Sequence, residues 1–199
     1  WSYAQRRVRI VSISVAKIAV AAVAAILFFG CGGVDSMRRR EQVAARIQYL
    51  CKRLDEHPED REAVLELRQC GISPYSFERC SALRAFGKMQ GLANEFIDIL
   101  ADGLGSDDKF VRDCAAQSLS ELGPKAAAAK SLLVKLLLEH PEERAAMFSA
   151  EALGAIGDDS PDVLHALSIG ATSDDELLRE ACASAYRAIT GKVLDQAAP

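Results

Sequence analysis

One phrase recurs through the second half of the chain at a nearly constant spacing. The stretch "DDKFVRDCAAQSLSELG" begins at Asp107, and "DDELLREACASAYRAITG" begins sixty-seven residues later at Asp174. Looser copies begin at Pro74 ("PYSFERCSALRAFGKMQ") and at Pro141 ("PEERAAMFSAEALGAIG"). A period of 33 or 34 residues predicts a repeat architecture, in which each unit buries its apolar face against its neighbours.

Each copy has the pattern of an amphipathic helix. Apolar or small residues recur at positions i, i+4 and i+7, which is the spacing of one helix face. The four sets are Ala82, Phe86 and Met89; Ala115, Leu119 and Leu122; Ser149, Leu153 and Ile156; and Cys182, Tyr186 and Ile189. A second apolar segment lies between successive copies, as in "AKSLLVKLLLEH" and "PDVLHALSIGATS". Each unit is therefore predicted to be a helical pair, and no alternating Val/Ile/Thr run predicts a strand.

Residues suited to helix ends flank the repeated phrase. Side chains that can cap a first turn stand before the second helix of a pair, at Ser76, Asp107, Asp108, Asp174 and Asp175. Pro141 suits the first helical position, where its missing N–H is not needed. Gly123, Gly157 and Gly191 follow the helices, where glycine ends a helix most easily.

The phrase also carries a family resemblance. The pattern D-x-x-V-R-x-x-A-x-x-A-L-x-x-L/I-G, seen from Asp107 and Asp174, resembles the short HEAT-like repeat of the phycobilisome-lyase type over roughly residues 57–191. The copy from Pro141 departs from it, with Ala145 and Ala146 in place of Val-Arg. The resemblance implies an all-α fold, an α-solenoid of HEAT-like helical pairs, and carries no recognisable catalytic residue.

The expected solenoid covers residues 42–191 and holds four pairs, followed by a tail of residues 192–199. Val43, Ile47, Leu50 and Leu54 form one helical stripe that we expect to cap the first edge of the stack. The stretch "HPEDREAVLELRQCG" is shorter than the other first helices, and we interpret it as an irregular first helix that pairs with residues 76–90.

The N-terminal residues have the composition of a membrane-directed segment. Arg6, Arg7, Arg9 and Lys17 precede a stretch with no charge from Ile18 to Val34. Residues 1–30 fit either a signal peptide or an uncleaved anchor, and Gly30 before Cys31 resembles a bacterial lipobox, with Cys31 as the lipidation site. Residues 31–41 would then be a basic tether, with its arginines at the lipid headgroups. A bacterial membrane-associated protein follows, with its repeats on the non-cytoplasmic side.

Composition and spacing argue against several kinds of site. Beyond residue 40 the chain has 17 basic and 27 acidic residues, which does not suit nucleic acid. No cofactor or metal site is expected, since Cys51, Cys70 and Cys80 lack metal-like spacing. One pair among these three could be oxidised, whereas Cys114 and Cys182 are interpreted as packing residues. His57 and His140 share the phrase "EHPE", which is typical of a repeated turn.

The remaining candidate is the surface that the second helices form. Three rows cross the repeats, and from them we predict the partner-binding residues Arg84, Lys88, Asp113, Gln117, Glu121, Met147, Glu151 and Glu180. They predict a groove that is basic at its first end and acidic toward its middle. The expected function is a non-catalytic scaffold, not an enzyme, that binds a protein or peptide. A bilin-lyase-like enzyme or subunit and a purely structural envelope protein are the alternatives, and a missing His/Tyr/Cys cluster argues against the lyase.

A recurrent arginine accompanies these rows, at Arg79, Arg112 and Arg179. We expect it to form charge pairs between adjacent repeats and so to set their stagger, in preference to contacting a ligand. Such pairs would affect geometry more than stability, because exposed ion pairs contribute only about 0–1 kcal/mol.

Overall fold

The computed structural model describes residues 34–194, which form helices joined by short turns and include no strand. Contacts divide the chain into two units, Trp1–Glu41 and Gln42–Pro199. The helices are α2 (Val34–Glu56), α3 (Arg61–Gly71), α4 (Ser76–Lys88), η1 (Gln90–Leu92), α5 (Ala93–Leu104), α6 (Lys109–Leu122), η2 (Gly123–Ala129), α7 (Lys130–Glu139), α8 (Arg144–Ile156), α9 (Pro161–Gly170) and α10 (Glu176–Thr190). The prediction of an all-α chain is confirmed for the described residues.

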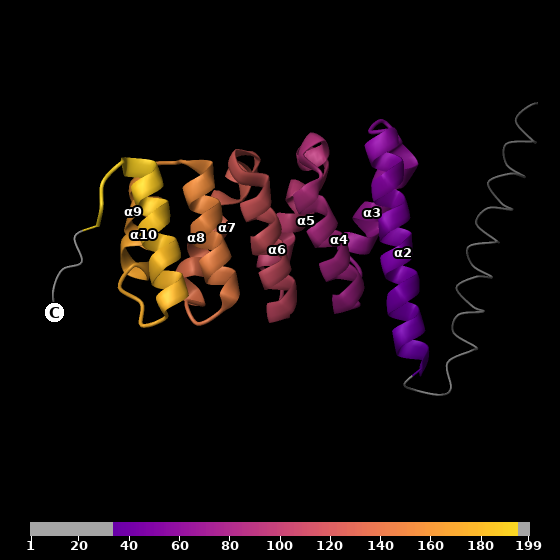
Figure 1. Cartoon of the computed structure of the whole chain (residues 1–199), viewed down its shortest axis with the longest axis horizontal. Helices are drawn as coiled ribbons and strands as arrows, with labels where there is room; N and C mark the ends of the chain where they lie inside the picture. The colour runs from indigo at the N-terminus through magenta and orange to yellow at the C-terminus, as the bar shows by residue number, and fades with distance from the viewer. Residues whose placement is uncertain (1–33, 195–199) are drawn as a thin grey trace, which may run out of the picture. The chain divides into compact units, whose positions relative to one another are not determined.

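The second unit is a stack of helical pairs. Helices α3 and α4, α5 and α6, α7 and α8, and α9 and α10 pack against each other within the pairs. The second helices α4, α6, α8 and α10 also pack against one another in chain order, and Figure 1 shows them side by side in one layer. Four pairs with a 33- or 34-residue period are therefore confirmed, including the irregular pair of α3 with α4.

The helix ends agree with the sequence in most places. The carboxylates of Asp108 and Asp175 accept hydrogen bonds from the first-turn N–H groups of α6 and α10. Gly123, Gly157 and Gly191 have positive φ, as a glycine after a helix allows. The prediction for Pro141 is wrong, because α8 begins at Arg144 after the extended residue Glu143. Pro141 lies instead in the preceding turn, in which the His140 carbonyl oxygen accepts a hydrogen bond from the N–H of Glu143.

The core runs between the two layers of helices. Phe86, Leu119 and Leu153, which are equivalent in successive repeats, are all fully buried. The ring of Phe86 stacks on that of Phe96 in α5, with centroids 4.2 Å apart. The pattern also predicts that Ile156, Tyr186 and Ile189 are buried; they pack against the core but are only half-buried. Tyr186 and Ile189 belong to the last repeat, which has no following helix in the described chain to cover them.

The first edge of the stack is formed by α2. Ile47, Leu50 and Leu54 are buried and Val43 packs against the core, so the predicted stripe is confirmed. Residues of the expected basic tether from Val34 onward are helical, because they continue α2 without a break. No helix within residues 34–194 has both the length and the apolarity to cross a bilayer. The predicted signal or anchor segment, residues 1–30, and the predicted lipidation site Cys31 lie outside the described residues.

Two members of the arginine series join adjacent repeats. Arg79 pairs with Asp102 at 2.9 Å, and Arg112 pairs with Glu143 through two hydrogen bonds. The Arg112 guanidinium lowers the pKa of the Glu143 carboxyl. Arg179 instead donates to the carbonyl oxygens of Ser173 and Asp174 in its own preceding turn. The structural interpretation is therefore confirmed for Arg79 and Arg112, whereas Arg179 secures its own turn.

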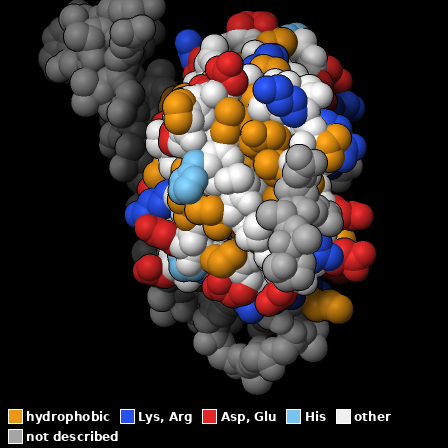
Figure 2. Space-filling view, turned by 90° about the vertical axis from the view of Figure 1, so that its left-hand side faces the viewer, with side chains coloured by type: hydrophobic (Ala, Val, Ile, Leu, Met, Phe, Trp, Pro, Cys, Tyr) orange, Lys and Arg blue, Asp and Glu red, His pale blue; other side chains and the backbone are white. Residues whose placement is uncertain are grey.

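The C-terminal end of the stack carries apolar side chains. Figure 2 shows hydrophobic side chains gathered on the end formed by α9 and α10, and Ile169 of α9 is 47% exposed. Arg187 occupies the position equivalent to Gly154 of the preceding repeat, and Gly154 is in close contact with Ala185 of α10. A further helix could not approach Arg187 as closely, so this end does not repeat the preceding interface.

Candidate functional site

The outward side chains of α4, α6, α8 and α10 form one continuous surface, called here the second-helix face. Contacts between equivalent or neighbouring positions join the repeats across it. The Arg84 guanidinium donates to the Gln117 side-chain oxygen at 3.4 Å, and the Ser120 hydroxyl donates to Glu151 at 3.2 Å. The sequence period therefore places the predicted rows side by side in space.

All eight predicted partner-binding residues lie on this face with part or all of the side chain accessible. Arg84, Lys88, Glu121, Glu151 and Glu180 are exposed, and Asp113, Gln117 and Met147 are half-buried. The basic residues belong to α4, while the acidic residues follow on α6, α8 and α10. Charge therefore changes along the face as the rows predict, and the acidic part extends as far as α10. Partner binding by these residues stays a prediction.

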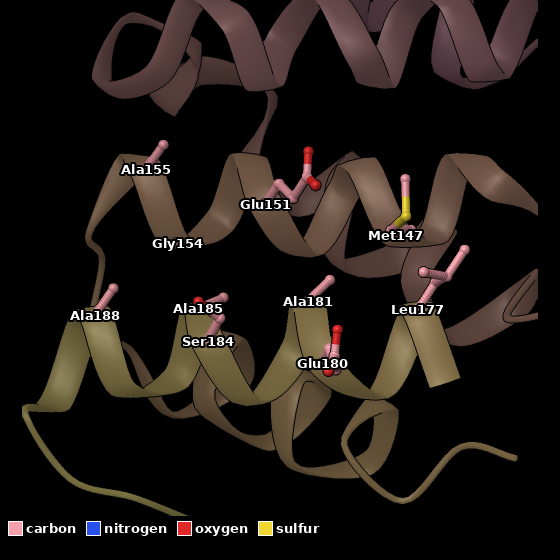
Figure 3. A pocket seen from close by; sticks show the side chains of 10 residues that line it. All are labelled: Met147, Glu151, Gly154, Ala155, Leu177, Glu180, Ala181, Ser184, Ala185 and Ala188. Atoms are coloured by element: carbon pink, nitrogen blue, oxygen red, sulfur yellow. The ribbon is translucent and has the colours of Figure 1, made fainter. Parts of the chain in front are cut away.

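Three of these residues line a groove between α8 and α10. The groove has a volume of about 530 Å³, and Met147, Glu151 and Glu180 contribute to its walls. Figure 3 shows them together with Leu177 and a run of small side chains on the two helices. Its volume falls within the range of about 300–1,000 Å³ that small-molecule sites occupy. The face therefore offers a hollow with both apolar and carboxylate walls.

Small residues explain why the groove is there. Ala181, Ala185 and Ala188 line it from α10, and none of them reaches far from the helix backbone. On the opposite side a Cβ on Gly154 would lie 2.8 Å from the Cβ of Ala185 and 2.9 Å from its Cα. The helices consequently meet closely at the level of Gly154, while the alanines leave open space beside the contact.

Asp113 has a half-buried carboxyl group. Burial raises the pKa of its carboxyl, although the N–H of Ala145 donates to it and Arg144 opposes the shift. Its Oδ1 atom is buried, and it has no hydrogen-bond partner within residues 34–194. A carboxyl that holds its proton closer to neutral pH is a candidate proton donor.

Cys80 and Cys114 form a pair that sequence reasoning missed. They belong to α4 and α6, both are half-buried, and the Cys80 thiol lies 3.4 Å from the Phe110 carbonyl oxygen. The two thiols also interact with each other, and this interaction raises the pKa of Cys80 and lowers that of Cys114. The repeat period could have indicated this pair, because residue 80 is equivalent to residue 113 of the next repeat and Cys114 directly follows residue 113. Cys114 packs against the core as expected, and it also lies beside Cys80 of α4.

One group of side chains could in principle hold a metal ion. Ligand atoms of His140, Glu142 and Glu143 all lie within 4.8 Å of one another. Glu143, however, already accepts two hydrogen bonds from the Arg112 guanidinium, whose positive charge opposes a cation at this place. His140 lies at the turn before α8, where the sequence phrase placed it. The arrangement favours an ion pair between repeats over a metal site.

Comparison with known proteins gives a likeness to a solved structure. No family model matches the chain, and no curated protein matches it. The chain is similar to a solved structure, that of the complex of CpcE and CpcF of phycocyanin lyase from Nostoc sp. PCC7120, with a TM-score of 0.55 and 24% sequence identity. It shares the fold of that lyase. The similarity covers 77% of this chain and 65% of the matched chain, so this chain corresponds to less than two thirds of its neighbour.

The likeness confirms the HEAT-like helical fold and corrects the functional prediction. A non-catalytic scaffold that is not an enzyme was expected, but the matched chain belongs to a lyase complex. The comparison therefore favours the lyase-like alternative. The matched structure is a complex of two proteins.

Proposed function

We propose that this chain is a bilin-lyase-like subunit that holds an open-chain tetrapyrrole on its second-helix face and works with a protein partner. The observation that carries the proposal is the fold shared with a phycocyanin lyase complex over 77% of the chain. Because fold alone does not fix function, the proposal also needs a site with suitable chemistry. The groove between α8 and α10 supplies one.

The groove suits the two kinds of surface that a bilin presents. The flat, apolar faces of the pyrrole rings would lie against Met147 and the alanines of α10. The ring N–H groups are hydrogen-bond donors, and the carboxylates of Glu151 and Glu180 are acceptors in the same walls. Apolar contact would supply affinity, while the two carboxylates would fix the orientation of the rings.

Asp113 is the proposed proton donor on this face. It occupies the same row as Met147, one helix away on α6. Burial raises the pKa of its carboxyl above that of an ordinary aspartate. In its protonated form this carboxyl would donate to a ring nitrogen or a carbonyl oxygen of a tetrapyrrole.

The protein partner would use a different surface. The end formed by α9 and α10 gathers hydrophobic side chains, with Ile169 of α9 47% exposed, and exposed apolar patches commonly mark contact sites. Arg187 prevents the partner from simply continuing the stack in register, since it stands where Gly154 permits close contact in the preceding repeat. We therefore propose that a partner packs on this end with a geometry different from that between the repeats.

Titration of the full-length chain with biliverdin tests the bilin proposal. We expect a red shift and a gain in intensity of the long-wavelength absorbance band, because a groove fixes the conformation of a flexible tetrapyrrole. Ala188→Trp, which fills the groove, should weaken binding at least about tenfold, or about 1.4 kcal/mol. Ala128→Trp is the control, since Ala128 is exposed in η2 and does not line the groove. Absence of any shift with the wild type contradicts the bilin function, and equal binding by Ala188→Trp moves the site elsewhere.

The location of the protein also remains a proposal. Residues 1–30 as a signal or anchor segment, with lipidation at Cys31 after cleavage, would place the repeats at the non-cytoplasmic surface of a bacterial membrane. Intact masses of the wild type and Cys31→Ser, compared after expression in a bacterium, distinguish the two alternatives. We expect the wild type to lack residues 1–30 and to carry acyl chains. Retention of residues 1–30 in both proteins would instead identify an uncleaved anchor.

A further inference from the structure

We infer that Cys80 and Cys114 form a reactive thiol pair that closes to a disulfide between α4 and α6 when it meets a peroxide. The inference rests on the packing of these two helices and does not depend on the proposed bilin function. It assigns a modification site to the second-helix face, with a peroxide as the chemical class that the site takes.

The stacking of the repeats places the cysteines on facing helices. Helices α4 and α6 pack along their length, and a Cβ on Gly87 would lie only 2.8 Å from the Cα of Ser118. Gly87 and Ser118 lie about two turns and about one turn C-terminal to Cys80 and Cys114, so each cysteine belongs to the same helix as one member of this contact. The contact of Cys80 with the Phe110 carbonyl places its sulfur over the turn of α6 that precedes Cys114.

The two thiols differ in reactivity because the Cys80 thiol keeps its proton as a hydrogen-bond donor. The Cys80 S–H donates to the Phe110 carbonyl oxygen and lies beside the Cys114 sulfur. Cys114 is the acceptor and lies near the positive charge of Arg84, both of which stabilise its thiolate. Since the thiolate is the nucleophile, Cys114 reacts first and Cys80 reacts second.

The other described cysteines lack this combination. Cys70 and Cys182 are buried, and burial raises the pKa of these thiols to about 11 and about 12. Cys51 is half-buried, and its pKa is also raised, chiefly by burial. These three have the character of small apolar side chains that fill the core. Among the cysteines of residues 34–194, only the pair of Cys80 and Cys114 is both partly accessible to solvent and includes a thiol whose thiolate form is stabilised.

The chemistry balances with a peroxide as the oxidant. The Cys114 thiolate attacks one oxygen of hydrogen peroxide, so that an S–O bond forms, the O–O bond breaks and hydroxide leaves. Cys80 loses its proton to that hydroxide, which becomes water. The Cys80 sulfur then attacks the sulfur of the Cys114 sulfenic acid, forming the S–S bond and releasing a second hydroxide, which takes a proton from solvent. The two sulfur atoms give up two electrons in total, and the peroxide is reduced to two waters.

Peptide mapping of the full chain after brief treatment with hydrogen peroxide tests the inference. Cleavage after Lys and Arg separates the two cysteines into peptides 80–84 and 113–125, each with a single cysteine. We expect these two peptides to be joined, with a mass two hydrogens below the sum of the free peptides, and to separate after dithiothreitol. At neutral pH without peroxide, iodoacetamide should modify Cys114 at least about tenfold faster than Cys70.

Two variants distinguish the pair from general oxidation. In Cys80→Ser the sulfenic acid on Cys114 has no resolving thiol, so dimedone should trap it there. Cys70→Ser is the control and should leave formation of the 80–84 to 113–125 link unchanged. The inference is overturned if no such link forms in the wild type, or if Cys114 is alkylated no faster than Cys70. Neither result bears on biliverdin binding, so the two proposals can fail independently.

Discussion

Phe86→Ala is expected to destabilise the solenoid by about 3–5 kcal/mol, the range for removal of a buried aromatic ring. Phe86 is fully buried, and its ring stacks on Phe96 of the next repeat at 4.2 Å. The ring also occupies the space beside Gly71, where a Cβ would lie 2.7 Å from the Phe86 ring. Three helices therefore meet at this ring, and its removal leaves a cavity that none of them can fill alone.

Urea unfolding of the full chain, followed by circular dichroism, measures the effect. The midpoint should fall while the slope stays close to that of the wild type, provided that the denatured state is unchanged. Phe110→Ala is the matched control, because Phe110 is 62% exposed and a surface change of this kind usually stays within about 0.5 kcal/mol. If the two variants lose similar stability, the assignment of Phe86 to the core is wrong.

The sequence predicts the fold well because the same amphipathic helix pattern occurs in each of the four repeats. The set of Phe86, Leu119 and Leu153 identified the buried face without any knowledge of the packing, since equivalent positions in a stack meet equivalent surroundings. The same reasoning failed for Tyr186 and Ile189, because a periodic pattern does not show where the stack ends. It failed for Pro141 because a proline satisfies both a turn and a first helical position.

The candidate site was less accessible to the sequence. The rows indicated which side chains share the second-helix face, but not which of them come into contact. The Cys80 and Cys114 pair depends on the lateral offset of α4 and α6, and the raised pKa of Asp113 depends on burial at the start of α8. Both depend on the relative position of neighbouring helices, and the repeat period alone does not determine this position. The function also could not be derived from the rows, because exposed charges serve binding and solubility alike.

Gly154→Val is expected to destabilise the chain by about 1–3 kcal/mol, although valine suits a helix slightly better than glycine. The new Cβ would lie 2.9 Å from the Cα of Ala185, and a backbone atom cannot move aside as a flexible side chain can. The equivalent residue of α4, Gly87, meets Ser118 in the same way, whereas the equivalent of α6, Ser120, donates to Glu151.

Ala155→Val is the control for stability alone, because Ala155 is the adjacent, exposed residue of α8 but also lines the groove. Its stability should stay within about 0.5 kcal/mol of the wild type by urea unfolding. Because α10 must move away from α8 to accept a side chain at position 154, Gly154→Val should also change the shape of the groove that both helices line. Biliverdin binding by the folded fraction should then fall. A Gly154→Val protein as stable as Ala155→Val would show that α8 and α10 do not meet at this glycine, and the groove would then lack its structural basis.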